Sequence, residues 1–336
     1  MALIQAPMAG VQGSALASAV SNAGGLGSLP CAMLSIERIR EEISAIRAQT
    51  DKPYNVNFFC HVPPPFSDEH EAAWRAALQP YYEEFGIDAS VIPTGPGRLP
   101  FSAEVARALN EFKPPVVSFH FGLPDAALLA QVRSWGAKIL SSATTIEEAL
   151  WLEAQGVDAV IAQGMEAGGH RGMFLTTDLT TQLGTFALLP QIVKAVNIPV
   201  IAAGGIADAR GVAAAMKLGA FGVQIGTAYM LCPETTTTAV HRAALKSDAS
   251  RHTALTNLFT GRPARGIMNR LMKELGPISA VTPEFPLATS AIAPLRAIAE
   301  SLGSGDFSPL WSGENASGCK EMSAAALTRE LAAGLS

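Results

Sequence analysis

Short runs of apolar, largely β-branched residues alternate along the chain with alanine-rich stretches whose apolar positions recur at helical spacing. This alternation is typical of repeated strand–helix units around a parallel sheet. Eight runs are predicted to be strands: residues 3–9, 25–29, 54–59, 116–121, 138–142, 159–163, 200–203 and 222–226. A helical stretch follows each of them, most clearly at residues 36–48, 126–135, 146–154, 209–218 and 240–247.

Eight consecutive units predict an α/β protein of the (β/α)8 TIM barrel type, because a parallel sheet of eight strands closes around an interior filled by side chains. Residues 60–115 are long, rich in proline and helical at 69–85 and 103–112, so we expect an insertion after strand 3 that shields one barrel mouth. We expect the barrel to occupy residues 1–252. Residues 253–336 should form a C-terminal helical extension that packs near the active site.

Composition and charge exclude several classes of partner. The chain has 24 basic and 29 acidic residues, and charged residues make up only 16% of it. No clustered basic surface for nucleic acid or an anionic membrane is expected from this balance. Neither a basic leader at the start nor about 18 uninterrupted apolar residues is present, so we expect a cytoplasmic protein. The cysteines lack a CxxC spacing and are expected to be reduced thiols: Cys31, Cys60, Cys232 and Cys319.

The carboxyl ends of the last two predicted strands are rich in glycine. Such barrels carry their working residues at this end of the sheet. Strand seven ends in Gly204 and Gly205, and strand eight runs through Gln224 and Ile225 into Gly226 and Thr227. Glycines let backbone N–H groups approach an anion, and a following helix N-terminus favours negative charge. These two loops therefore predict a phosphate site.

Two histidines lie at predicted strand ends. His170 stands in the glycine-rich stretch after strand six, where an imidazole with a pKa near 6.5 could accept a proton or bind an anionic oxygen. His120 lies near the end of strand four, and by alternation it should point away from Phe119 and Phe121 toward the barrel mouth. A buried structural histidine is the alternative there. Surface positions are expected for the remaining histidines: His61, His70, His241 and His252.

Asn57 and Gln163 end strands three and six with amides that can donate and accept hydrogen bonds. A pair of amides around the mouth suits a flat heterocycle with mixed hydrogen-bonding edges. The sequence has no HxH, HExxH or carboxylate cluster at one strand end, so no metal is expected. It also has no G-x-S-x-G turn of a serine hydrolase.

Six segments together resemble the nitronate monooxygenases, formerly called 2-nitropropane dioxygenases, and specifically their class I branch. The likeness extends from about residue 3 to residue 230 and fades in the insertion. The segments are QAPMAGV at 5–11, SNAGGLGS at 21–28, SFHFG at 118–122, QGMEAGGHRG at 163–172, AAGGI at 202–206 and QIGT at 224–227.

The resemblance implies an FMN enzyme that oxidises alkyl nitronates, such as propionate 3-nitronate, with O2 to a carbonyl compound and nitrite. It implies that His170 is catalytic and that His120 contacts the substrate. It implies no metal, a role in detoxification, and a monomer or homodimer. The residues that would hold the flavin are Ala6, Pro7, Met8, Asn57, Gln163, Gly168, Gly204, Gly205, Gln224, Ile225, Gly226 and Thr227.

Three other functions are compatible with the same pattern. They are an NAD(P)H-dependent flavin reductase (enoyl or quinone reductase) on this fold, an inactive flavin or phosphate binder, and a flavin-free barrel that isomerises phosphorylated sugars. The chain also departs from the class I pattern. Relatives are expected to supply tyrosines and a lysine from the C-terminal region, but no tyrosine follows Tyr229, and Phe285 stands where one is expected. Glu314 stands where glutamine often follows the glycine.

Overall fold

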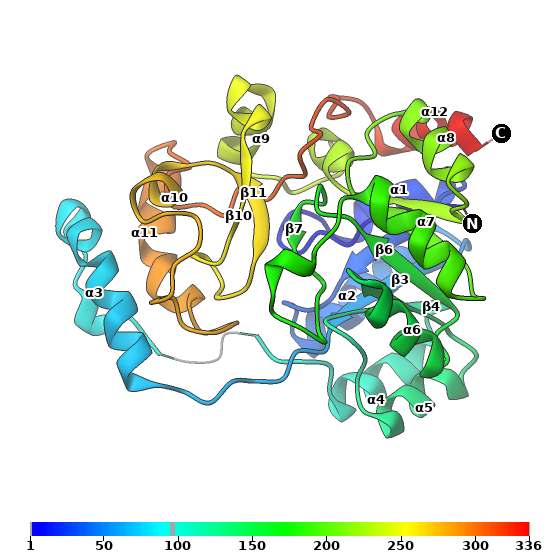
Figure 1. The fold of residues 1–336 in the computed structure, drawn as a ribbon, viewed down its shortest axis with the longest axis horizontal. Helices are drawn as coiled ribbons and strands as arrows, with labels where there is room; N and C mark the ends of the chain where they lie inside the picture. Colours follow the sequence, from blue (N-terminus) through cyan, green and yellow to red (C-terminus); the bar gives the residue numbers. More distant parts are fainter. Residues whose placement is uncertain (1, 95–97, 336) are drawn as a thin grey trace.

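An eight-stranded parallel sheet forms the larger lobe, at the right of Figure 1, of the computed structural model, which describes residues 2–94 and 98–335. Its strands follow the order β1-β9-β8-β6-β5-β4-β3-β2, and a parallel bridge between Ile4 and Leu26 closes the ring. The predicted (β/α)8 TIM barrel is thus confirmed. The strands are Leu3–Gln5 (β1), Gly27–Pro30 (β2), Tyr54–Phe59 (β3), Val116–His120 (β4), Lys138–Ala143 (β5), Ala159–Gln163 (β6), Val200–Ala203 (β8) and Gly222–Ile225 (β9).

Helices cover the outside of this barrel because each buries an apolar stripe against the sheet. Several begin at a side-chain cap that satisfies a free backbone N–H, as Ser35 does for Arg38 and Thr145 does for Glu148. The barrel helices are Ser14–Asn22 (α1), Ile36–Gln49 (α2), Ala103–Phe112 (α4), Ala126–Ser134 (α5), Ile146–Ala154 (α6), Thr185–Ala195 (α7) and Ala209–Lys217 (α8). Helix Ala239–Lys246 (α9) packs instead on the turn at Asp248–Arg251.

Alternation along the strands separates the outer apolar layer from a polar interior near the barrel mouth. In β3, Tyr54 and Val56 belong to the large apolar cluster between sheet and helices. Asn55 and Asn57 point the other way, and both amides donate to the Ser118 hydroxyl, at 2.9 Å each. The sheet therefore presents hydrogen-bonding groups inside the barrel.

A second lobe lies beside the barrel (Figure 1) and joins the insertion to the C-terminal region. Helix α3 (Asp68–Phe85) packs against α11 (Thr289–Ser301), whereas α4 packs against α2 and α5 as a barrel helix does. The three-stranded sheet of this lobe reaches back to the barrel mouth through β7. Its further elements are β10 (Thr253–Thr256), β11 (Ala264–Ile267), β7 (Gly169–His170) and α10 (Arg270–Glu274).

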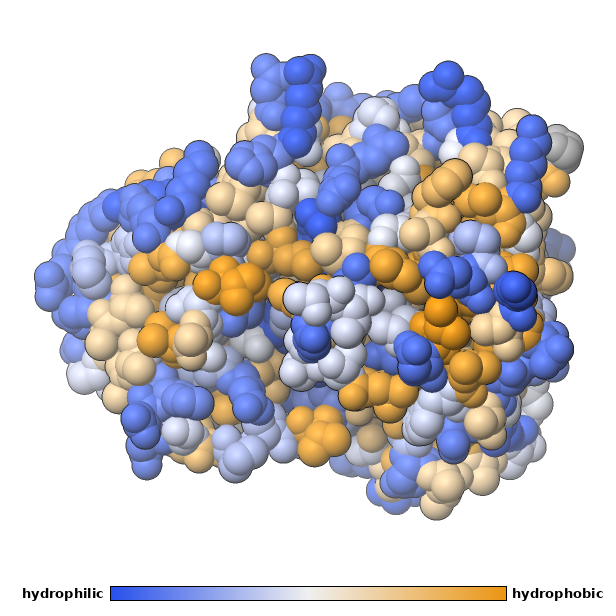
Figure 2. Space-filling model, in the orientation of Figure 1, coloured by the Kyte–Doolittle hydropathy of each residue, from blue (hydrophilic) through white to orange (hydrophobic). Residues whose placement is uncertain are grey.

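The chain returns to the barrel after this lobe. Helix α12 (Ala324–Ala332) packs against α1 and α8, and the Thr328 hydroxyl lies 2.9 Å from the Tyr229 hydroxyl. Hydrophilic residues cover the outer edge of the second lobe, while hydrophobic residues appear in small patches over the barrel (Figure 2). Within the described residues, none of the helices combines the length and apolar character needed to cross a membrane.

We expect Trp74→Ala to destabilise the second lobe by about 3–5 kcal/mol, because it removes a large buried side chain and leaves a cavity. Trp74 is fully buried in the α3–α11 interface, and its indole N–H donates to the Ala288 carbonyl at 3.2 Å. Urea denaturation would measure the loss, with the exposed Glu83→Ala on the same helix as the control. Equal stability of the two variants would contradict this account of the interface.

Candidate active site

One cavity opens at the carboxyl ends of the barrel strands and brings together all the candidate residues singled out in the sequence. They come from six segments of the chain, and Ala6 and Thr227 are 221 positions apart. Its lining includes Ala6, Pro7, Met8, Asn57, His120, Gln163, Gly168, His170, Gly204, Gly205, Gln224, Ile225, Gly226 and Thr227. Among the described residues, no group of three or more histidine, cysteine or acidic side chains is placed to hold a metal ion.

The glycine-rich loops after β8 and β9 lie side by side, because these two strands pair directly. Gly204 and Gly205 have φ angles of 118° and 72°, a region that favours glycine. Helix α8 begins just beyond them, with Asp208 as its cap. The loop pair thus offers backbone N–H groups and a nearby helix N-terminus to an anion.

The side-chain amides of Gln163 and Gln224 at the barrel mouth differ in their hydrogen bonds. The Gln163 side chain accepts from Gly172 N at 2.8 Å and donates to the His170 carbonyl at 2.9 Å, so it fixes the loop that carries His170. The buried Gln224 oxygen has no hydrogen-bond partner in the described part of the chain. A buried acceptor of this kind requires a donor from a ligand or water. A ligand with an N–H group would supply the donor that the Gln224 oxygen lacks.

His170 is held in β7, whose antiparallel partner is Ala264 in β11. Its Nε2 lies 2.9 Å from the Thr260 hydroxyl oxygen. When the Thr260 hydroxyl donates to the Arg262 carbonyl at 3.4 Å, Nε2 donates to Thr260 and Nδ1 keeps its lone pair. The imidazole is packed between the rings of Phe285 and Trp311, with centroids 5.3 and 5.5 Å away.

His120 is bonded at both ring nitrogens. Nε2 lies 3.2 Å from the His170 carbonyl and must donate to it, and Nδ1 then accepts from the Ser142 hydroxyl at 3.1 Å. The predicted inward direction of His120 is confirmed. The expectation for Phe121 is wrong, because β4 ends at His120 and Phe121 has a φ of 69°, which turns its ring back to 4.6 Å from His120.

Burial keeps both histidines neutral at pH 7. It lowers the pKa of His120 to about 4 and that of His170 well below its ordinary value, with Arg98 adding positive potential at His170. An uncharged imidazole can accept a proton or bind an anionic ligand as a donor. The cationic charge near His170 therefore belongs to arginines.

Two of the histidines expected at the surface are buried. His61 is only 4% exposed and its ring packs edge-on against Phe285, while His241 is 6% exposed and lies 3.0 Å from the Trp311 carbonyl. Both contacts join segments far apart in the chain. No local sequence pattern predicts these contacts.

We expect the free energy of unfolding to fall as the pH drops from about 6.5 to about 4. Burial holds the pKa of His120 and of His241 at about 4 in the folded chain, whereas an unfolded histidine titrates near 6.5. Within this window the unfolded chain binds more protons, so acid favours it. The loss should reach roughly 1–2 kcal/mol per histidine at about pH 5, measured by urea denaturation. A stability that is flat over this window would show that these histidines protonate in the folded state.

Several lining residues have no signal in the sequence. Arg98 comes from the insertion, and Trp311, Gly313 and Asn315 come from the C-terminal region. Gly313 N donates to the Thr227 hydroxyl at 2.9 Å, and the Asn315 amide donates to the Gly205 carbonyl at 3.0 Å. The strap formed by residues 311–315 thus lies over the glycine-rich loops.

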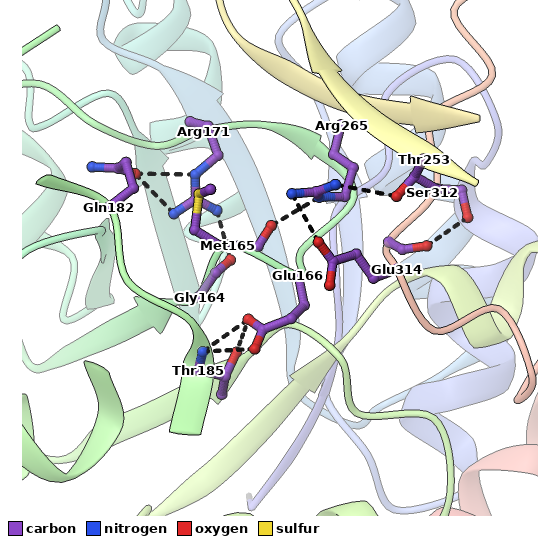
Figure 3. A network of polar contacts seen from close by, with 11 residues as sticks. Gly164, Met165, Glu166, Arg171, Gln182, Thr185, Thr253, Arg265, Ser312 and Glu314 are labelled. Atoms are coloured by element: carbon purple, nitrogen blue, oxygen red, sulfur yellow. Dashed lines mark hydrogen bonds and ion pairs between the residues drawn. The ribbon is translucent and has the colours of Figure 1, made fainter. Parts of the chain in front are cut away.

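Two arginines fix the turn between β6 and β7 (Figure 3). Arg171 is fully buried and donates to the Gly164 carbonyl at 2.6 Å, and Arg265 donates to the Met165 carbonyl at 2.8 Å. Arg265 also pairs with Glu314 of the strap at 3.0 Å. Glu166 is occupied, since its carboxylate accepts from Thr185 N and Oγ1 at 2.8 Å each. The loop that carries His170 is therefore held from both sides.

Comparison with known proteins gives a consistent result over nearly the whole chain. A family model described as nitronate monooxygenase matches residues 1–334. The chain is 43% identical to a nitronate monooxygenase of Pseudomonas aeruginosa, covering 98% of this chain and 94% of that protein.

Solved structures agree with this assignment. A nitroalkane oxidase from Streptomyces ansochromogenes has a TM-score of 0.90 and 37% identity, covering 99% of this chain and 95% of that one. FabK from Thermotoga maritima is more distant, with a TM-score of 0.71 and 27% identity over 99% of this chain and 91% of its own. The chain therefore belongs to the nitronate monooxygenase family of flavin-dependent oxidoreductases.

Proposed function

We propose that this enzyme uses FMN and O2 to convert alkyl nitronates, such as propionate 3-nitronate, to a carbonyl compound and nitrite. The observation that carries the proposal is the placement of a neutral His170, with a free Nδ1, in the same cavity as the glycine-rich loops and the Arg98 side chain. A nitronate is an anion, and this end of the cavity combines a hydrogen-bonding imidazole with cationic charge.

The residues present fit FMN. Gly204, Gly205, Gly226 and Thr227 would hold the phosphate, because their loops can offer backbone N–H groups to an anion. Gln224 would accept a hydrogen bond from the flavin ring through its unpaired oxygen. Asn57 and one hydrogen of the Gln163 amide would also face the ring. The backbone and side chains that would border it are those of Ala6, Pro7, Met8, Gly168 and Ile225.

When bound, the flavin would supply the electron-accepting chemistry, while the protein supplies position and charge. His170 Nδ1 would take the carbon-bound proton if a neutral nitroalkane enters. With a substrate already present as the nitronate, Thr260 would instead donate to Nε2, so that Nδ1 carries the proton and donates a hydrogen bond to the anion. The rings of Phe285 and Trp311, which pack edge-on and tilted against His170, would limit the access of water to this side of the site.

The main role of His120 would be to position the backbone of His170. Both of its ring nitrogens are engaged by the protein, and one of them holds the His170 carbonyl. Gln163 holds the same carbonyl from β6. We therefore propose that His120 lines the substrate space with its ring while fixing the backbone that carries His170.

Anaerobic mixing tests the proposed function. The purified protein should be yellow, and FMN should be released on denaturation. Addition of propionate 3-nitronate without O2 should bleach the flavin rapidly, whereas NADH or NADPH should not. Bleaching by NAD(P)H alone would instead assign the chain as a flavin reductase, and a colourless, flavin-free protein would reject the flavin chemistry altogether.

A further inference from the structure

The Arg98 side chain borders the cavity without an anionic partner. Arg98 belongs to the insertion, just before α4, and lies in the wall of the cavity that contains His170. Within residues 2–94 and 98–335, its guanidinium makes no ion pair or hydrogen bond. Burial lowers the pKa of Arg98 to about 10, so the group remains charged at pH 7. A desolvated cation without a counter-ion is unfavourable, and an anion from a ligand would offset that cost.

Other polar groups that lack hydrogen-bond partners lie near Arg98, around the rings of Phe121 and Phe285. Phe121 and Phe285 contact each other with ring centroids 5.4 Å apart. The Arg98 guanidinium carbon lies 5.7 Å from the Phe285 centroid, and that of Arg262 lies 4.0 Å from the Phe121 centroid. His61 packs on Phe285 at 4.8 Å. Neither ring nitrogen of His61, nor Nε of Arg262, has a partner in the described part of the chain.

Among the described residues that line the cavity, none at the His170 end carries a carboxylate. The acidic side chain in the lining, among the residues described, is Glu166, and it is bonded to Thr185 beside the glycine-rich loops. Its Cβ would lie only 3.4 Å from a Cβ added at Gly205, on the side assigned to phosphate. The two ends of the site therefore differ in charge, and the His170 end has two arginines with three histidines of lowered pKa.

We propose that Arg98 binds a carboxylate on the substrate, remote from the reacting nitronate group, and thereby selects carboxylated nitronates over plain alkyl nitronates. This rests on the proposed function and adds a specificity-determining residue to it. The planar guanidinium can hold a carboxylate through two parallel hydrogen bonds. A substrate that ends in a methyl group leaves the cation unpaired, so the site discriminates against it.

A matched pair of substrates tests this role. Propionate 3-nitronate carries the carboxylate, and 3-methylbutyl-1-nitronate has an isopropyl group of similar shape in its place. Arg98→Met should reduce kcat/KM for the first by about 100-fold, mainly through KM, and change the second by less than about 3-fold. Arg98→Lys should recover part of the loss. Arg107→Met, which removes an exposed charge from the neighbouring helix α4, should change neither substrate.

Equal losses on both substrates would show that Arg98 only supports packing, and unchanged kinetics on both would show that it does not contact the substrate; either result overturns the inference. Turnover of neither substrate by the unmodified protein would reject the proposed function instead. Calorimetric binding of 3-nitropropionate would still test Arg98 in that case, because the inference requires affinity to fall about 10-fold or more in Arg98→Met.

Discussion

His170→Asn should lower turnover of propionate 3-nitronate by about 100- to 1,000-fold while the flavin stays bound, because it removes the hydrogen bond that orients the anion. The substitution removes the free Nδ1 of a ring that is already oriented by Thr260 at 2.9 Å. It leaves the glycine-rich loops after β8 and β9 unchanged. Steady-state nitrite release would measure the loss, and the absorption spectrum of the variant would report the flavin content.

Two further variants make the His170 result specific. Thr260→Val should give a smaller loss, about 10-fold, because the ring remains but its tautomer is no longer fixed. His70→Asn, at an exposed position on α3, should have no effect. If His170→Asn turned over substrate as fast as the unmodified protein, the imidazole would have no part in the reaction.

Gly168→Ala should weaken flavin binding by roughly 10- to 100-fold through the cost of overpacking. An added Cβ at Gly168 would lie 2.5 Å from Gly313 N and 2.6 Å from the Ser312 carbonyl carbon. Both are backbone atoms, so the strap of residues 311–315 would have to shift. That shift would break the bond from Gly313 N to the Thr227 hydroxyl, which joins the strap to the predicted phosphate loop.

The neighbouring glycine provides a control with the same added atom. A Cβ at Gly169 would have no atom within 4 Å, although its φ of 71° costs about 1 kcal/mol of stability for alanine. Gly169→Ala should therefore retain the flavin with only a small fall in Tm. Flavin fluorescence after dilution would compare the two variants, and equal retention in both would contradict the role assigned to the strap.

Much of the candidate site could be predicted because barrel geometry converts sequence order into spatial order. Gly204, Gly205 and Gly226 each follow a strand directly, and parallel strands bring their carboxyl ends to one mouth. Asn57 and Gln163 could be assigned to the mouth for the same reason. The inward direction of His120 followed from the period of two along β4.

The site residues that were not predicted lie in segments outside the strand–helix repeat of the barrel. Arg98 and Trp311 reach the cavity, and Thr260 reaches His170, through loops whose paths are set by long-range packing. The docking of Trp74 of the insertion on α11 is one such contact. His61 was misassigned for this reason, since its burial depends on Phe285, more than 200 positions away. Phe121 was misassigned because its φ of 69° interrupts the alternation of β4.

The sequence by itself therefore determined the barrel, the glycine-rich loops and the histidine at the mouth, since local periodicity and strand-end position define each of them. Only the tertiary structure decided the charge and closure of the site. The unpaired Arg98, the His170–Thr260 bond and the strap over Gly168 all join segments that no local pattern connects, and their energies arise from burial and contact in the folded chain.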